Sequence, residues 1–122
     1  MLRLYSTLSR QKEVFKPLGE VVNIYVCGVT PYDHCHIGHA MSYVVFDVLR
    51  RYLKFKGYSV RYVQNFTDID DKIINRARQT GKTPSELAQQ HITNYFRDMD
   101  TLRIERADFY PRVTEEIAKI QE

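Results

Sequence analysis

The feature that most constrains the fold of this chain is a short polar stretch, residues 27–39, between two apolar segments. It holds both cysteines and three of the four histidines of the chain. The apolar run Val21–Val26 precedes it, and a longer apolar segment, residues 41–55, follows it. Since β-branched runs favour buried strands, the pattern predicts a strand, a loop and a helix, with the polar chemistry gathered in the loop.

The segment after the loop extends this pattern. Apolar residues recur at helical spacing over Ala40–Lys56 and predict a largely buried helix, which Gly57 ends. Residues 58–63 then have the composition of a second strand. Strand, helix and strand form a βαβ unit, whose strands are parallel and whose crossover is right-handed. Because parallel strands end at one edge of a sheet, we expect the Cys27 loop and residues 65–71 to face one crevice.

The remaining elements follow from local signals. Thr67 has a capping-box-like spacing to Asp70, which predicts a helix start there, and Thr83, Pro84 and Glu86 form a clearer start for the next helix. The sequence predicts an edge strand at Leu2–Ser6 and helices over 9–16, 67–80, 83–102 and 112–121. The chain ends inside a helical pattern, without a final strand that returns to the sheet.

Composition narrows the class of protein. The chain has 122 residues, enough for one small domain with a core. It contains no signal peptide and no apolar run long enough to cross a membrane, so we expect a cytoplasmic protein. In that compartment, two cysteines more often stay reduced, bind metal or react than form a disulfide. The net charge of +3 is too small to indicate a nucleic-acid partner.

The sequence His36-Ile37-Gly38-His39 lies where the strand–loop–helix pattern places a helix start. Two imidazoles beside the amide groups of a helix N-terminus suit a polyphosphate, and they can donate hydrogen bonds as charge moves onto a leaving group. Gly38 has no Cβ, so a flat base can approach its backbone. The alternative is a pair of surface histidines beside a capping glycine.

A metal site is a second alternative for the same loop. Cys27, His34, Cys35 and His36 are all potential ligands. Their close alternation does not match the spacing of a compact zinc finger, so a metal site is the weakest of the three interpretations, and the other two stay open.

Three stretches together resemble one family. Residues 25–39, from Tyr-Val-Cys-Gly-Val-Thr-Pro-Tyr-Asp to the paired histidines, resemble the signature of class I aminoacyl-tRNA synthetases and are most similar to cysteinyl-tRNA synthetases. Residues 65–74 and 4–17 also follow that family. The resemblance implies an α/β fold in which residues 1–122 are the N-terminal half of a Rossmann-like nucleotide-binding domain, with a parallel βαβ core and additional helices.

The resemblance implies the activity of a cysteine–tRNA ligase. Such an enzyme activates cysteine with ATP, accompanied by Mg²⁺, to cysteinyl-adenylate and transfers it to tRNA(Cys). No membrane takes part, and the whole protein is expected to be a monomer. Two other functions stay open: the related cysteine ligase of mycothiol biosynthesis, which joins cysteine to an amino sugar, and a truncated non-catalytic paralogue that acts as a binding module.

The resemblance also assigns roles to residues. His36 and His39 would be catalytic, Thr67 would contact the cysteine substrate, and Cys27 would be a zinc ligand. The residues expected to bind ATP are Gly28, Thr30, Tyr32, His36, Gly38 and His39. A zinc ion would select the soft thiolate of cysteine over the serine hydroxyl, whereas an apolar pocket discriminates only about 10–200-fold. For Thr67, a helix cap is the alternative role.

Parts of the family pattern are missing from the chain. The other three zinc ligands and the second signature, a Lys-Met-Ser-Lys-Ser-like loop, are absent and would follow residue 122. The resemblance assigns no metal role to Cys35, which we interpret as structural. We therefore expect a piece of a longer synthetase that by itself neither forms cysteinyl-adenylate at a useful rate nor holds zinc tightly.

Two surfaces have open interpretations. A basic cluster at the end of the 40–56 helix and in the next strand either contacts RNA or is a solvated helix end: Arg50, Arg51, Lys54, Lys56 and Arg61. The apolar stripe of that helix, which includes Val44, Val45, Val48 and Leu49, normally needs the other half of a sheet to cover it. Without that half, we expect an exposed apolar face or self-association.

Overall fold

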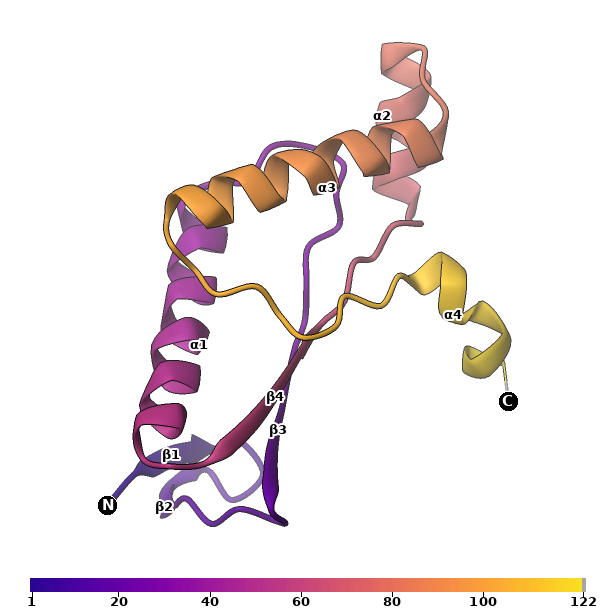
Figure 1. Ribbon diagram of the computed structural model, residues 1–122. Coiled ribbons are helices and arrows are strands. Elements are labelled where there is room, and N and C mark those ends of the chain that lie inside the picture. Colours follow the sequence, from indigo (N-terminus) through magenta and orange to yellow (C-terminus); the bar gives the residue numbers. More distant parts are fainter. Residues whose placement is uncertain (122) are drawn as a thin grey trace.

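The computed structural model of the chain describes residues 1–121. Two small sheets and four helices make up this part of the chain (Figure 1). In chain order the elements are β1 (Arg3–Ser6), β2 (Gln11–Val14), β3 (Val21–Val26), α1 (Ile37–Phe55), β4 (Ser59–Gln64), α2 (Asp71–Thr80), α3 (Pro84–Thr101) and α4 (Val113–Ile120).

The predicted βαβ unit is confirmed. β3 and β4 pair in parallel, with Val21 opposite Ser59 and Val26 opposite Gln64. α1 connects them and begins at Ile37, three residues earlier than predicted. The carboxyl ends of both strands therefore reach the same edge of the sheet, where the polar loop begins.

Residues 108–113 form an irregular segment that lies beside β4 and pairs with it. The amide of Gln64 donates to the carbonyl of Phe109 at 3.1 Å, and the amide of Phe66 donates to the carbonyl of Pro111 at 2.9 Å. The sequence predicted no final strand in this sheet, and residues 1–121 form none after β4; instead, this irregular segment pairs with β4 through isolated bridges. Pro111 has no N–H and only isolated residues pair, so the sequence carries no strand pattern here.

The basic end of α1 fastens this returning segment, which Figure 1 shows crossing β4. Arg50 is only 4% exposed. Its guanidinium donates to the carbonyl of Arg106 at 2.6 Å and to both carboxylate oxygens of Asp108 at 3.2 Å. Lys54 pairs with Glu105 at 2.7 Å. Arg50 is therefore a buried structural residue, which neither the RNA surface nor the solvated helix end describes. Lys54 stays exposed, and its surface ion pair is compatible with a solvated helix end.

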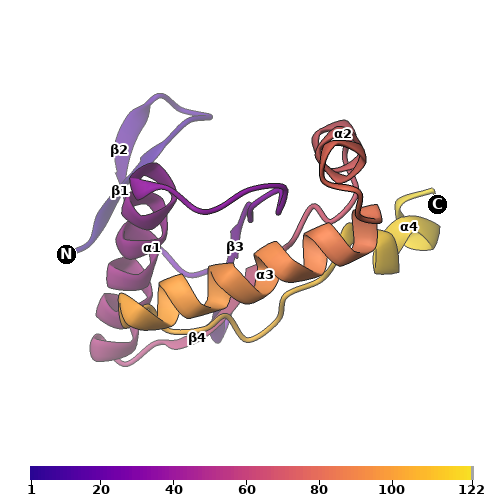
Figure 2. The ribbon, with the colours of Figure 1, turned by 90° about the horizontal axis from the view of Figure 1, so that it is seen from above.

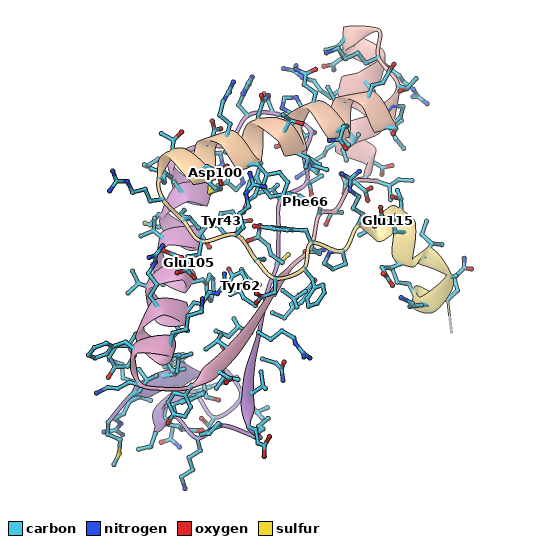
Figure 3. The ribbon with its side chains drawn as sticks, in the orientation of Figure 1. Tyr43, Tyr62, Phe66, Asp100, Glu105 and Glu115 are labelled. Carbon is cyan, nitrogen blue, oxygen red and sulfur yellow. The ribbon has the colours of Figure 1, made fainter. Side chains whose placement is uncertain are left out.

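The core lies between α1, the sheet and α3. Tyr43 of α1 and Phe66 after β4 both point into this interior (Figure 3). Each meets the ring of Tyr95 edge to face, with centroids 5.6 and 5.2 Å apart. Thr83 and Glu86 form the predicted capping box at the start of α3, which runs between the α1 and α2 ends of the molecule (Figure 2).

The N-terminal region differs from the prediction. Residues 9–16 were predicted to be helical, but β2 pairs antiparallel with β1, with Arg3 opposite Val14. All four side chains of β2 are exposed. Its polar composition therefore carries little information about secondary structure, and pairing with β1 overrides helix propensity.

The prediction that α1 is largely buried was also wrong. Its buried residues are Tyr43, Arg50 and Leu53. The apolar stripe faces outward, and Met41, Val45 and Val48 are 69%, 60% and 59% exposed. The expected exposed apolar face is therefore present in the part of the chain described. No helix in residues 1–121 is long and apolar enough to cross a membrane.

This face predicts that the chain, by itself, associates. Replacing two residues on it, Met41→Glu and Val45→Lys, should shift the chain toward monomer and change its free energy of unfolding by only about 0.5 kcal/mol, because both side chains are exposed. Light scattering after size exclusion at two concentrations measures the effect. Asn75→Glu with Gln79→Lys on α2 is the matched control. A monodisperse wild-type monomer at the higher concentration would contradict the prediction.

Candidate functional site

Two short contacts join the strand ends at the site. The amide of Gly28 donates to the side-chain oxygen of Asn65 at 2.8 Å. One residue after Gly28 and two residues after Asn65, the amide of Thr67 donates to the carbonyl of Val29 at 3.1 Å. Gly28 lies so close that an added Cβ would be 1.5 Å from the Asn65 carbonyl oxygen. The expected crevice at the strand ends is thus closely held at its base.

Cys27 and Thr67 are placed by these contacts. Cys27 is exposed directly after β3, and its carbonyl accepts from the Tyr43 hydroxyl at 3.4 Å. Thr67 does not cap a helix, since α2 begins later and Asp70 is its N-cap, accepting from the amide of Lys72 at 2.8 Å. The predicted capping role of Thr67 is wrong, and its hydroxyl stays available for another role.

A cavity of about 150 Å³ lies beside this crevice. Residues 29–36 form most of its wall, and His39 and His91 complete it. All four histidines of the chain therefore line one cavity. Of the predicted ATP-binding residues, it brings together Thr30, Tyr32, His36 and His39. Gly28, Gly38, Cys27 and Thr67 are not part of its wall.

The two predicted catalytic histidines cap the start of α1. His36 is the N-cap residue, and its Nδ1 accepts from the amide of Gly38 at 3.1 Å. Nδ1 of His39 accepts in return from the amide of His36 at 3.2 Å. Their rings lie 3.9 Å apart at an angle of 30°. These two amides are already paired, so they are not the open phosphate-binding amides expected from the sequence.

This capping fixes the proton positions. A neutral imidazole has one N–H donor and one acceptor nitrogen. Because Nδ1 accepts in both rings, the neutral form of each carries its proton on Nε2. A protonated Nε2 cannot bind a metal ion but can donate to an oxyanion. The geometry therefore favours phosphate binding over metal binding for His36 and His39.

The pKa values of two histidines in this cavity, His39 and His91, are shifted so that their rings stay neutral and can act as hydrogen-bond donors. Burial, with a smaller contribution from His36, lowers the pKa of His39 below its usual 6.5. Burial and the adjacent His34 likewise lower the pKa of His91, against the opposing effect of Asp33. Both rings are thus neutral near pH 7.

The lowered pKa values predict a loss of stability in mild acid. Below the usual histidine pKa, the unfolded chain binds protons that folded His39 and His91 resist, so the free energy of unfolding should fall as pH decreases from about 7.5 to 5.5. Above about pH 7.5 these two residues no longer make the free energy of unfolding depend on pH. Urea midpoints across the window measure it. The His39→Asn, His91→Gln double variant should show a shallower slope, and a wild-type midpoint that rises toward acid would contradict the assignment.

Metal ligation has little support in the described residues. Residues 1–121 bring together no group of three His, Cys, Asp or Glu side chains that could hold a metal ion. Cys27 provides one exposed thiol, which by itself is not a zinc site. Cys35 is half-buried against the core, and burial raises the pKa of its thiol to about 11. A protonated, packed thiol fits the structural interpretation of Cys35.

Sequence reasoning missed two residues of this region. Asn65 was predicted to face the crevice only as part of the 65–71 segment and was given no role of its own, although a polar side chain directly after a strand is a signal for the sheet edge. His91 gave no signal that it belongs to the site, because it lies in α3 beside Ile92 and near Ala88 on the buried side of that helix. Only the fold brings it to the cavity.

Comparison with known proteins identifies close relatives. Residues 14–122 match the family model described as tRNA synthetases class I (C) catalytic domain. The chain is 61% identical to a cysteine–tRNA ligase of Maridesulfovibrio salexigens, over 99% of this chain and 25% of that protein. It is 58% identical to a cysteine–tRNA ligase of Pyrococcus furiosus, over 100% of this chain and 26% of that one. The chain thus spans about a quarter of the length of these relatives.

Solved structures share the fold. The methionyl-tRNA synthetase of Mycobacterium tuberculosis in complex with methionyl-adenylate matches with a TM-score of 0.68 and 26% identity, over 75% of this chain and 18% of that one. The Agrobacterium radiobacter leucyl-tRNA synthetase, in a ternary complex with tRNA, matches with a TM-score of 0.65 and 28% identity, over 73% of this chain and 12% of that one. Both are synthetases, so the likeness covers the Rossmann-like α/β arrangement predicted above.

Proposed function

The chain belongs to the family of class I (C) tRNA synthetase catalytic domains, and we propose that it contributes the phosphate-binding part of the adenylate-forming site of a cysteine–tRNA ligase. The observation that carries the proposal is that both Nδ1 atoms at the start of α1 accept backbone hydrogen bonds, which leaves each Nε2–H as a donor. Imidazole Nδ1 atoms that cap the helix hold His36 and His39 in one tautomer and orientation. Preorganised donors of this kind stabilise developing charge without reorganising during the reaction.

The proposed chemistry has two steps. First, a carboxylate oxygen of cysteine attacks the α-phosphorus of ATP, the bond to the bridging oxygen breaks, and pyrophosphate leaves with the electron pair. His36 and His39 donate hydrogen bonds to phosphate oxygens as this charge develops. A ribose hydroxyl of the terminal adenosine of tRNA(Cys) then attacks the cysteinyl carbonyl carbon, the bond from that carbon to the phosphate oxygen breaks, and AMP leaves as the hydroxyl proton is released.

The other predicted residues have proposed roles around this centre. Thr30 and Tyr32 line the histidine cavity, so we place them beside the phosphates, and the contact of Gly28 with Asn65 keeps the loop close to the sheet. Gly38 leaves room for the His36 ring. Mg²⁺ would accompany ATP.

The cysteine substrate is proposed to lie on the other side of the loop. Cys27 and Thr67 follow neighbouring strands, which supports a role for the Thr67 hydroxyl in binding the amino acid and for the Cys27 thiolate as one zinc ligand. When bound, zinc would select a thiolate over a hydroxyl. Residues 1–121 bring together no group of three His, Cys, Asp or Glu side chains that could hold a metal ion, so we derive no step from the metal.

Several proposals concern the whole protein. Because the relatives are about four times as long as this chain, we propose that residues 1–122 are the N-terminal part of the catalytic domain, and that the remaining zinc ligands, the second signature and the anticodon-binding domain belong to other sequence. By itself this chain should form little cysteinyl-adenylate and hold zinc weakly. We also propose that the whole protein is a monomer and acts in the cytoplasm, where ATP and tRNA are present.

Aminoacylation by the whole protein tests this function. Purified protein, ATP, Mg²⁺, labelled cysteine and a tRNA(Cys) transcript should give acid-precipitable cysteinyl-tRNA, and serine should give none. A transcript of another tRNA is the control. Formation of an amide with an amino sugar instead would favour the mycothiol-type ligase. No activation of cysteine at all would favour a binding module, and either result would reject the proposal.

A further inference from the structure

The fourth histidine of the chain shares the cavity of the two catalytic candidates, although it comes from α3. His91 is only 7% exposed and lines the cavity with His34, His36 and His39. Its ring meets that of His34 edge to face, with centroids 5.3 Å apart. The chemistry proposed above gives His91 no role.

The two ring nitrogens of His91 have different surroundings. Nδ1 is enclosed and has no hydrogen-bond partner within residues 1–121. An enclosed N–H without an acceptor is rarer in proteins than an unused acceptor, so the neutral ring should carry its proton on Nε2. The lowered pKa of His91 fits this, because a second proton would have to go onto the enclosed Nδ1. His91 then has an N–H donor available to the cavity, as His36 and His39 have.

The surroundings favour an oxyanion as the ligand. His36, His39 and His91 all line one space of about 150 Å³, well above the roughly 10–15 Å³ that one water molecule needs, so a phosphate group has room there. The wall also contains one carboxylate, that of Asp33, whose charge is countered by pairing with Arg76 at 3.4 Å. Nζ of Lys72 lies 5.6 Å from the ring centre of Tyr32, another wall residue. The cavity therefore combines donors with nearby cationic side chains.

We infer that His91 is a third imidazole contact for the phosphate oxygens of the bound nucleotide. This inference rests on the proposed function for the choice of a nucleotide, and it adds a residue from α3 to a site otherwise built from the loop and α1. Phosphate held by all three rings would join the 29–36 loop to α3. The interaction would therefore both bind the nucleotide and fix the loop position.

Pyrophosphate binding to the whole protein, measured by calorimetry, tests the role of His91. His91→Leu removes the donor, and affinity should fall about tenfold, as expected for one lost hydrogen bond to a charged group. His91→Gln places an amide N–H near the Nε2 position and should bind within about threefold of wild type. Thr93→Ala, an exposed position on the same helix, should leave the affinity unchanged.

Each outcome decides the question. Equal affinity of wild type and His91→Leu would overturn the inference, as would equal weakening by the leucine and glutamine variants. If His91→Leu fails to fold, imidazole nitrogen NMR of the wild-type protein decides instead: adding pyrophosphate should shift the Nε2 resonance of His91, and an unchanged resonance would reject the contact. Because these readouts need no catalysis, a protein that fails to activate cysteine would reject the proposed function without deciding the role of His91.

Discussion

Replacing Gly28 with alanine should lower the free energy of unfolding of the chain by about 3 kcal/mol. The new Cβ would lie 1.5 Å from the carbonyl oxygen of Asn65, and backbone atoms cannot move apart cheaply. The strand ends would have to separate, which breaks the hydrogen bond from the Gly28 amide to the Asn65 side chain. Denaturant unfolding followed by circular dichroism measures the loss.

Gly19→Ala is the matched control for this substitution. Nothing lies within 4 Å of a Cβ added at Gly19, so its effect should stay within about 0.5 kcal/mol. Asn65→Asp keeps an oxygen acceptor for the Gly28 amide and should be milder than Asn65→Leu. A Gly28→Ala variant as stable as Gly19→Ala would show that the two strand ends are not held as closely as described.

Replacing Gly38 with alanine should, unlike Gly28→Ala, cause a large loss of activity with little loss of stability. The added Cβ would lie 2.9 Å from Cε1 and 3.0 Å from Nδ1 of His36, so the imidazole must move. Losing the cap costs about 1 kcal/mol, and replacing glycine in a helix returns about as much. The rate of cysteinyl-adenylate formation by the whole protein should fall about a hundredfold, as when one preorganised donor is lost.

The pattern of kinetic constants separates this effect from general damage. For Gly38→Ala, kcat for cysteine-dependent ATP–pyrophosphate exchange should fall, while the KM for cysteine stays near wild type, because the Cys27 and Thr67 side of the loop is undisturbed. A variant with normal kcat would indicate that the position of the His36 ring has no catalytic importance.

The sequence predicted the βαβ core and the meeting of its strand ends because these follow from strong local patterns. The run Val21–Val26 is rich in β-branched residues, the next segment has helical spacing, and parallel strands must end at one edge. From this alone, Gly28 and Thr67 were expected at one crevice, and their contacts with Asn65 and Val29 agree. The family resemblance predicted the same arrangement.

The rest depended on contacts that no local pattern encodes. Residues 108–113 join the sheet through a few backbone hydrogen bonds and an Arg50–Asp108 pair that bridges a long stretch of chain. The outward direction of the Val45 and Val48 stripe depends on what covers α1, since apolar spacing shows only which residues share a face. His91 looked like an ordinary residue on the buried side of α3, and only tertiary packing brings it to the cavity.

We propose that His36 has two separate tasks: it caps α1 through Nδ1 and donates to the nucleotide phosphates through Nε2. The rate of cysteine-dependent ATP–pyrophosphate exchange by the whole protein carrying His36→Asn tests it most directly. Asparagine is a strong N-cap and keeps an acceptor where Nδ1 lies, but it has no counterpart of Nε2. We expect unchanged stability and a rate about a hundredfold lower than wild type. A variant that is equally stable and equally active would contradict it.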